Sequence, residues 1–126
     1  HSYYLTDDAS ILRRTLNLSP EEQKREIEAA GKHPVYSNEE IDFLLDRVAV
    51  EVQFGKYFSI AWDIFVRHLS YYNREQIDVG VEILPMKSMQ SEMSSGPGYF
   101  EMAMGALARH GRATPAMPLV ILGIEP

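Results

Sequence analysis

The chain has 126 residues, a formal net charge of −6 and no cysteine. Its 45% apolar and 24% charged residues are typical of a globular protein with one buried core. The lack of cysteine excludes disulfides and thiolate chemistry, and we expect a reducing, cytoplasmic setting. No apolar run is long enough to cross a bilayer, so membrane insertion is not expected. We predict one domain over 1–126, and the start at His1 rather than methionine indicates a module of a longer protein.

Two helices are expected in the first part of the chain. Ser19, Pro20 and Glu22 provide an N-cap, a first-turn proline and the acid of a capping box, which predicts a helix over 20–30. The preceding residues, 1–18, fit either a helix that starts at Thr6-Asp7-Asp8 or a short strand. A second capping sequence and an apolar stripe predict a helix over 38–47, with the stripe at Ile41, Leu44, Leu45 and Val48.

Apolar runs further along the chain predict four strands, near 48–54, 57–67, 77–84 and 118–124. A polar turn between the second and third runs favours an antiparallel pair. The fold class is therefore α+β, with a small antiparallel sheet or barrel and two helices packed on it. The segment 57–72 also has apolar residues at helical spacing, so a helical interaction module is an alternative.

No residue pattern indicates catalysis or a cofactor. The four histidines are isolated from one another, so no metal site is predicted, and no serine lies in a nucleophile elbow. Asp63 is interpreted as a cross-strand partner of a neighbouring base. The mixed charges leave no one-sided basic surface, so we expect no binding to a nucleic-acid duplex.

All six methionines lie between residues 86 and 117. Flexible thioethers fill irregular gaps in a core, and they also line adaptable grooves for partner proteins. Core filling is the first interpretation. The second is a contact surface for another protein, formed by Met86, Met89, Met93, Met102 and Met104.

The strand series resembles a known family. The runs 47–50, 58–62 and 77–84, the last with Gly80-Val81-Glu82-Ile83, resemble the later strands of PilZ-type domains, which are small β-barrels that bind cyclic di-GMP in bacterial regulatory proteins. Asp8-Ala9-Ser10 matches the start of the family's Asp/Asn-x-Ser-x-x-Gly motif, although Arg13 replaces its glycine and its two-arginine motif is absent. The resemblance covers about residues 47–84 and implies a nucleotide site at Asp8, Ser10, Arg13 and Arg14.

We therefore expect a non-enzymatic regulatory or adaptor domain in signalling, which acts through protein contacts and through cyclic di-GMP binding. An alternative is a small α+β enzyme whose site is shared across a homodimer. Its motivation is a loop over 87–98 beside a tryptophan-bearing strand, and a cluster of Asp63, Arg67 and His68 with a residue of the partner chain in a deep pocket would favour it. A homo-oligomer is left open.

Overall fold

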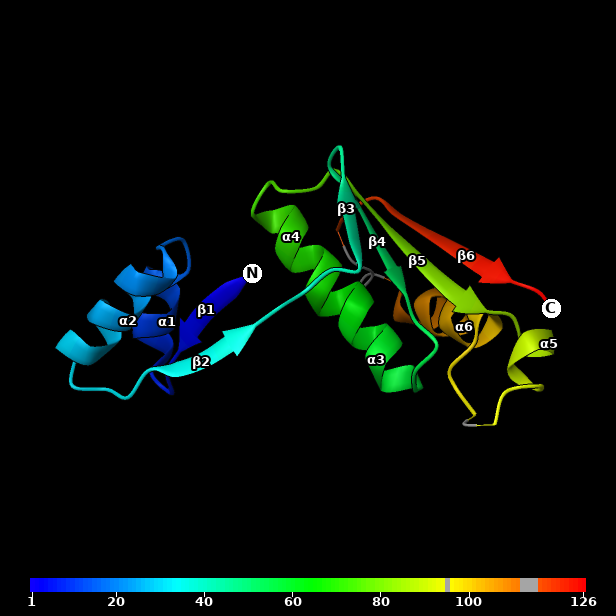
Figure 1. Ribbon diagram of the computed structural model, residues 1–126, viewed down its shortest axis with the longest axis horizontal. Helices are drawn as coiled ribbons and strands as arrows, with labels where there is room; N and C mark the ends of the chain where they lie inside the picture. The colour runs from blue at the N-terminus through cyan, green and yellow to red at the C-terminus, as the bar shows by residue number, and fades with distance from the viewer. Residues whose placement is uncertain (95, 112–115) are drawn as a thin grey trace. The chain divides into compact units, whose positions relative to one another are not determined.

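The computed structural model describes residues 1–94, 96–111 and 116–126. The described residues form a mixed α+β fold, as predicted, and two sheets can be followed in Figure 1. Backbone contacts divide the chain into two compact units, 1–40 and 41–126. The prediction of a single domain stays a prediction. In the described ranges, no helix has the length and apolar character needed to span a membrane.

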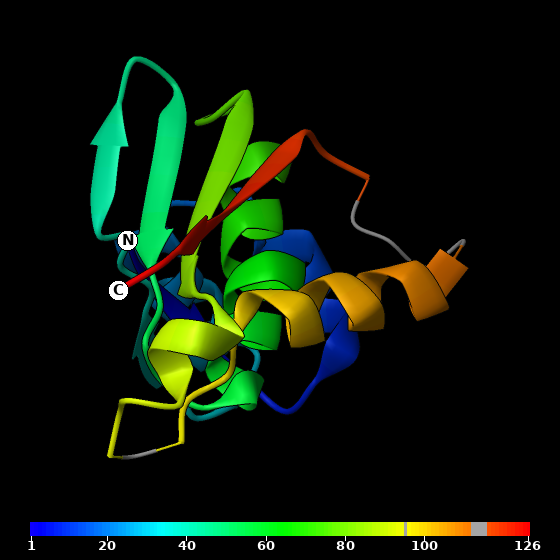
Figure 2. The ribbon, with the colours of Figure 1, turned by 90° about the vertical axis from the view of Figure 1, so that its right-hand side faces the viewer.

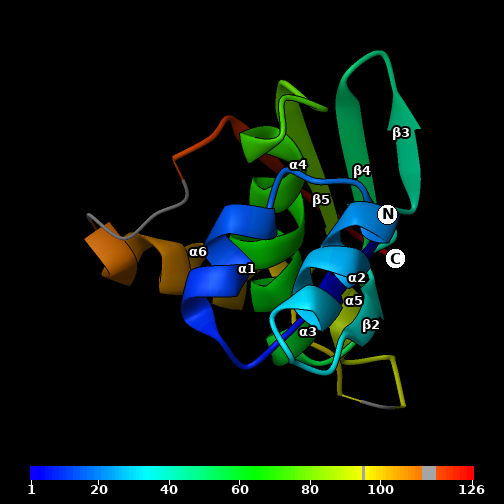
Figure 3. The same ribbon diagram turned by 90° about the vertical axis from the view of Figure 1, so that its left-hand side faces the viewer.

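The first unit contains a two-stranded antiparallel sheet and two helices. Its elements are β1 (Ser2–Leu5), α1 (Ala9–Thr15), α2 (Pro20–Ala29) and β2 (Val35–Asn38). Figure 3 shows α1 and α2 beside one another. Both alternatives for the first 18 residues are present, because a strand is followed by a helix that starts after Asp8.

Short-range hydrogen bonds explain why α2 starts where the sequence predicts. The Ser19 Oγ accepts the Glu22 N–H, and a Glu22 carboxylate oxygen accepts the Ser19 N–H. This reciprocal pair satisfies two backbone donors that the first turn of a helix leaves open. The helix predicted over 20–30 is confirmed as Pro20–Ala29.

The second unit is built on a four-stranded sheet with the order β3-β4-β5-β6. Its strands are β3 (Phe43–Leu45), β4 (Val48–Val52), β5 (Val79–Pro85) and β6 (Leu119–Ile124). The strands predicted near 48–54, 77–84 and 118–124 are confirmed, and the sheet is open rather than a closed barrel. The antiparallel prediction is wrong for two of its pairs, because β4–β5 and β5–β6 are parallel. Parallel neighbours need long crossovers, and helical segments supply them here.

The helix predicted over 38–47 is absent, and a hairpin replaces its second half. β3 pairs antiparallel with β4 through a turn at Asp46 and Arg47, whose φ angles are +48° and +64°. Such a turn usually carries Asn-Gly, so the sequence lacked its common signal. Arg47 is instead held in this conformation by two hydrogen bonds to the Asp78 carboxylate, both 2.8 Å long.

The strand predicted near 57–67 is also wrong, and this part of the chain is helical. It forms α3 (Tyr57–Trp62), the π-helical turn η1 (Asp63–His68) and α4 (Leu69–Asn73). The buried stripe is Ile60, Asp63, Ile64, His68 and Tyr71, which follows helical spacing. The alternation in sequence was misleading because its members Phe58 and Trp62 are exposed. Tertiary burial therefore overrides the β-propensity of the aromatic and branched residues.

Two further helices, α5 (Lys87–Gln90) and α6 (Phe100–His110), follow β5. α5 lies within the predicted loop over 87–98, of which residue 95 lies outside the described residues. Figure 2 shows α6 and the helical segment 57–73 on the same side of the sheet. There they enclose a core cluster with one residue from each packed element: Ile60, Ile64, Leu84 and Ala103.

Candidate active site

Two acidic residues and a glutamine meet at one end of the β3–β4 hairpin. Alternation along β4 directs Val48 and Val50 to one face of the sheet and the buried Glu51 to the helix-covered face. Asp42 comes level with Glu51, because the next residue, Phe43, pairs with Val50. The Asp42 carboxylate accepts the Val52 N–H at 2.9 Å, which fixes it at the strand end.

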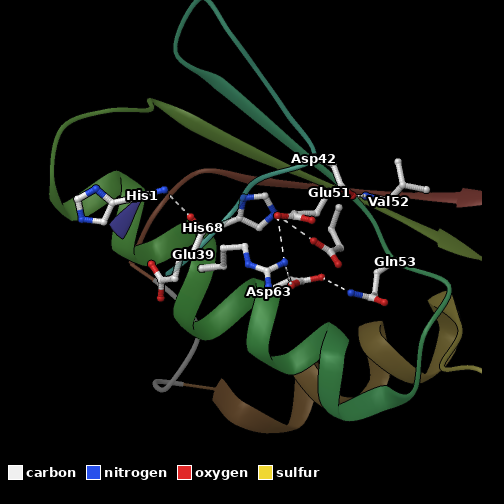
Figure 4. Close-up of polar contacts among 10 residues, drawn as sticks. His1, Glu39, Asp42, Glu51, Val52, Gln53, Asp63 and His68 are labelled. Carbon is white, nitrogen blue, oxygen red and sulfur yellow. Dashed lines mark hydrogen bonds and ion pairs between the residues drawn. The ribbon is translucent and has the colours of Figure 1, made fainter. Parts of the chain in front are cut away.

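Gln53, two residues beyond Glu51, is held at both ends of its side-chain amide. Its Nε2 donates to the Asp63 Oδ2 at 2.7 Å, and its Oε1 accepts the Gly55 N–H at 2.9 Å. Figure 4 shows the Gln53 amide directed at the Asp63 carboxylate. The first residue of η1 therefore contacts the strand end directly.

Arg67, one helical turn after Asp63, bridges the helix and the strand. Its Nη1 donates to the Asp63 Oδ1 at 2.8 Å and to the Glu51 Oε1 at 3.2 Å. The carboxylates retain 1% and 2% of their accessible surface, and the arginine retains 25%. One partly exposed cation thus contacts two buried acids and can balance the charge of only one of them.

The pKa of Glu51 is raised above its usual value although the guanidinium of Arg67 lies close to it. Burial raises this pKa to about 7, and although Arg67 lowers it, the carboxylates of Asp63 and Asp42 raise it further. Three acids therefore share one arginine. A site of this kind favours binding of an additional cation.

His68 and Glu82 form a second buried pair on the same face of the sheet. The His68 Nε2 lies 3.0 Å from the Glu82 Oε2, and neither side chain retains accessible surface. Burial lowers the pKa of His68 and raises that of Glu82, with Asp63 and Glu51 raising the latter further. Both shifts favour the neutral forms of the two groups, which share one hydrogen bond between the carboxyl and the imidazole.

A pocket of about 310 Å³ borders the cluster. Gln53, Asp63 and Arg67 contribute to its lining, together with Phe58, Ser59 and Trp62. The exposed rings of Phe58 and Trp62 lie with their centroids 6.2 Å apart. The polar cluster is thus open to a substrate on a side that also offers aromatic surface.

The residues predicted from the PilZ resemblance belong to the first unit. Asp8 caps α1 by accepting the N–H groups of Ser10 and Ile11, and these bonds lower its pKa. Arg14 lies 4.0 Å from Glu26 in an exposed ion pair, and Arg13 is exposed in the last turn of α1. These contacts are those of a capped helix end and its surface, and nothing in the structure assigns them a ligand.

The methionines divide between core and surface. Met117 is buried in a core cluster, as the core-filling interpretation requires. The predicted partner surface is mixed: Met102 and Met104 are exposed, whereas Met86, Met89 and Met93 are half-buried. Residues 112–115 of this segment lie outside the described residues. The partner surface stays a prediction.

The sequence analysis missed Asp42, Glu51 and Gln53 because it placed Asp42 inside a helix. The available signal was an acid followed, after one hairpin turn, by Glu-x-Gln on the polar face of a strand. Asp63 and Arg67 do cluster, as the enzyme alternative expects, although they do so on a helix. Their interpretation as residues of a strand is wrong.

One family comparison bears on this site. The family model described as restriction endonuclease BglII/BglIII matches residues 8–124. No curated protein matches the chain. The family match overturns the PilZ resemblance, the cyclic di-GMP ligand and the signalling role.

The same match corrects the prediction that the protein binds no nucleic-acid duplex, because restriction endonucleases act on DNA. The prediction rested on the total charge of −6 and on the mixing of charges along the chain. Contact with a phosphate backbone depends on the local charge at the interface, which such totals do not report. Acids that gather at a cation site also lower the net charge without opposing DNA binding.

Proposed function

This chain belongs to the restriction endonuclease BglII/BglIII family, and on that premise we propose that it hydrolyses phosphodiester bonds of duplex DNA at the cluster of Asp42, Glu51 and Gln53. One observation carries the assignment to these residues. The buried Glu51 and the exposed Asp42 are adjacent at a strand end, and burial and neighbouring acids raise the pKa of Glu51 to about 7. A buried carboxyl group beside other acids lowers the free energy of unfolding, and groups with such perturbed pKa values are frequent at functional sites.

A divalent metal ion fits this donor set, and Asp42 and Glu51 would hold it. Mg²⁺ prefers oxygen ligands and is commonly bound by one or two carboxylates, with water and substrate phosphate completing its shell. Residues 1–94, 96–111 and 116–126 contain no group of three or more histidine, aspartate or glutamate side chains arranged as ligands of one metal ion. When bound, such a cation supplies stabilisation of the charge that develops on the scissile phosphate.

The protein's own side chains fix the remaining geometry. The hydrogen bonds of Gln53 to Asp63 and Gly55 use one N–H and one lone pair of its amide, which leaves a second N–H for a phosphate or water oxygen and a second lone pair for a water proton. In hydrolysis, a water oxygen attacks phosphorus, the P–O ester bond breaks, and the departing oxygen takes a proton. An amide that is locked in place orients such oxygens without an entropic penalty during the reaction.

The experiment is cleavage of long, mixed-sequence duplex DNA by the full chain in the presence of Mg²⁺. We expect D42N and E51Q each to lower the cleavage rate by roughly 100-fold or more. D46N is the matched control, since Asp46 lies in the turn of the same hairpin and asparagine also accepts its positive φ. Equal rates for the wild type, D42N and E51Q would contradict the proposal.

The cytoplasmic location expected from the sequence suits a DNA substrate and stays a proposal. A homo-oligomer also stays a proposal. Cutting both strands of a duplex needs two phosphodiester cleavages, and a symmetric dimer with one site per chain is the simplest arrangement. Sedimentation of the full chain with and without duplex DNA tests this point.

A further inference from the structure

We propose that Asp63 and Arg67 are positioning residues for the reaction, which set the orientation of Gln53 and Glu51 from the π-helical turn η1. This inference rests on the proposed function and adds to it. Neither residue is needed as a metal ligand or as a group that reacts. Arg67 acts through Glu51 of β4, and Asp63 acts through Gln53, which directly follows that strand.

The division of hydrogen bonds supports this assignment. The two oxygens of Asp63 have different partners: Oδ2 accepts from Gln53 at 2.7 Å, and Oδ1 accepts from Arg67 at 2.8 Å. The same Nη1 of Arg67 reaches the Glu51 Oε1 at 3.2 Å. A continuous chain of contacts thus runs from Gln53 through Asp63 and Arg67 to Glu51. Moving one member shifts the side chains of both residues at the strand end.

The helix that carries this pair is anchored in the core. Ile60 and Ile64 flank Asp63 on the buried stripe and retain 1% and 2% of their accessible surface. Side chains mounted on a packed helix are held more closely than side chains on a loop. Asp63 and Arg67 both lie in the π-helical turn, from which Arg67 reaches Glu51 of β4 and Asp63 reaches Gln53 just beyond the strand. Such turns are frequent at functional sites because they redirect side chains locally.

Stability alone does not account for the network. Buried acids around one arginine cost desolvation free energy, and well-packed apolar residues of similar volume usually stabilise a fold equally well or better. The arrangement becomes understandable if the acids must stay in one orientation at the edge of a pocket. Gln53, Asp63 and Arg67 all line the 310 Å³ pocket beside the hairpin.

The decisive variant is D63N, which preserves the size of the side chain. Asparagine has one acceptor oxygen, so it can accept from Gln53 or from Arg67 but not in the observed pattern from both. The matched control is D46N, which removes an exposed acid from the turn of the β3–β4 hairpin, where asparagine also accepts the positive φ. R67K is the second variant, because its single ammonium keeps the charge but loses the planar geometry of guanidinium.

Three readouts separate positioning from a structural role. We expect D63N and R67K to lower kcat by roughly 10–100-fold, with KM for the duplex changed by less than about twofold. D46N should match the wild type. The melting temperature shows whether a variant folds, and if D63N melts too low to assay, R67K decides. An unchanged kcat in the folded variants, while E51Q loses cleavage, would overturn the positioning role and leave the proposed function intact.

The side-chain amide of Gln53 gives a readout that needs no activity. Its two N–H resonances, assigned by their loss in Q53M, should be shifted and slow to exchange in the wild type. They should move toward solvent-exposed positions in D63N but not in D46N. If the wild type cleaves no DNA, the proposed function fails, and this spectrum still decides the positioning role. Identical Gln53 resonances in the wild type and D63N would overturn it.

Discussion

Glu51 of β4 and Glu82 of β5 are register partners, so two buried carboxyl groups lie side by side on the helix-covered face of a parallel strand pair. They have different neighbours. Glu51 contacts Arg67, whereas Glu82 contacts the imidazole of His68. This difference predicts that the two acids respond differently to pH and to cations.

We expect the stability of the wild type to fall with rising pH because of Glu82. Its folded-state pKa is raised above the usual value of 4.5, chiefly by burial. The stabilisation is therefore complete below that value and is lost as pH rises above it, by up to about 1.4 kcal/mol per pH unit. E82Q keeps a donor to His68 but cannot ionise. Denaturant unfolding at several pH values should show the wild type losing stability relative to E82Q as pH rises, and parallel curves would contradict this prediction.

The buried carboxyl group of Glu51 should lower the stability of the protein as pH rises, and we expect a divalent cation to reverse this loss. Its pKa is raised from 4.5 to about 7, so its contribution to stability is lost as pH rises through that range. Without divalent cations at about pH 8, E51Q should be more stable than the wild type by up to about 3 kcal/mol. Adding Mg²⁺ should raise the melting temperature of the wild type but not that of E51Q. Equal shifts in both proteins would place the cation elsewhere.

Gly80 is required beside His68. A Cβ at Gly80 would lie 2.8 Å from the His68 Nδ1 and 3.1 Å from the Met117 Cε, and both side chains are buried. We expect G80A to lower the free energy of unfolding by about 1–3 kcal/mol. The control is G105A, in the interior of α6, where the nearest atom is the Arg109 Nη1 at 3.7 Å. This change should stabilise the helix by up to about 1 kcal/mol, and thermal unfolding of both variants tests the contrast.

In the first unit, Gln23 joins three elements. Its Nε2 donates to the Thr15 carbonyl and its Oε1 accepts the Tyr4 N–H, both at 3.0 Å, and the side chain is 5% exposed. Q23M keeps the volume but removes the partner of the Tyr4 N–H, at a cost of about 1–3 kcal/mol, whereas the Thr15 carbonyl still accepts the Leu18 N–H. K24M, at the neighbouring exposed position of α2, should change stability by less than about 0.5 kcal/mol. Hydrogen exchange of the Tyr4 amide should quicken in Q23M alone.

Local patterns allowed a good part of the fold to be predicted. The capping box at Ser19 uses atoms only three residues apart, so the start of α2 needs no tertiary information. The strands β4, β5 and β6 could likewise be found from their apolar residues. The turn at Asp46 and Arg47 could not, because its positive φ angles depend on an ion pair with Asp78, 31 residues further on.

The sequence by itself determined the α+β class, the start of α2 and the positions of three strands, because these follow from short-range hydrogen bonding and local hydrophobic spacing. Only the tertiary structure decided that 57–73 is helical and that β4, β5 and β6 are parallel. It also decided the candidate site. Glu51, Asp63 and Glu82 come from three elements, and the chemistry of these buried carboxyl groups depends on the neighbours that the fold supplies. Long-range packing therefore set both the topology and the chemistry.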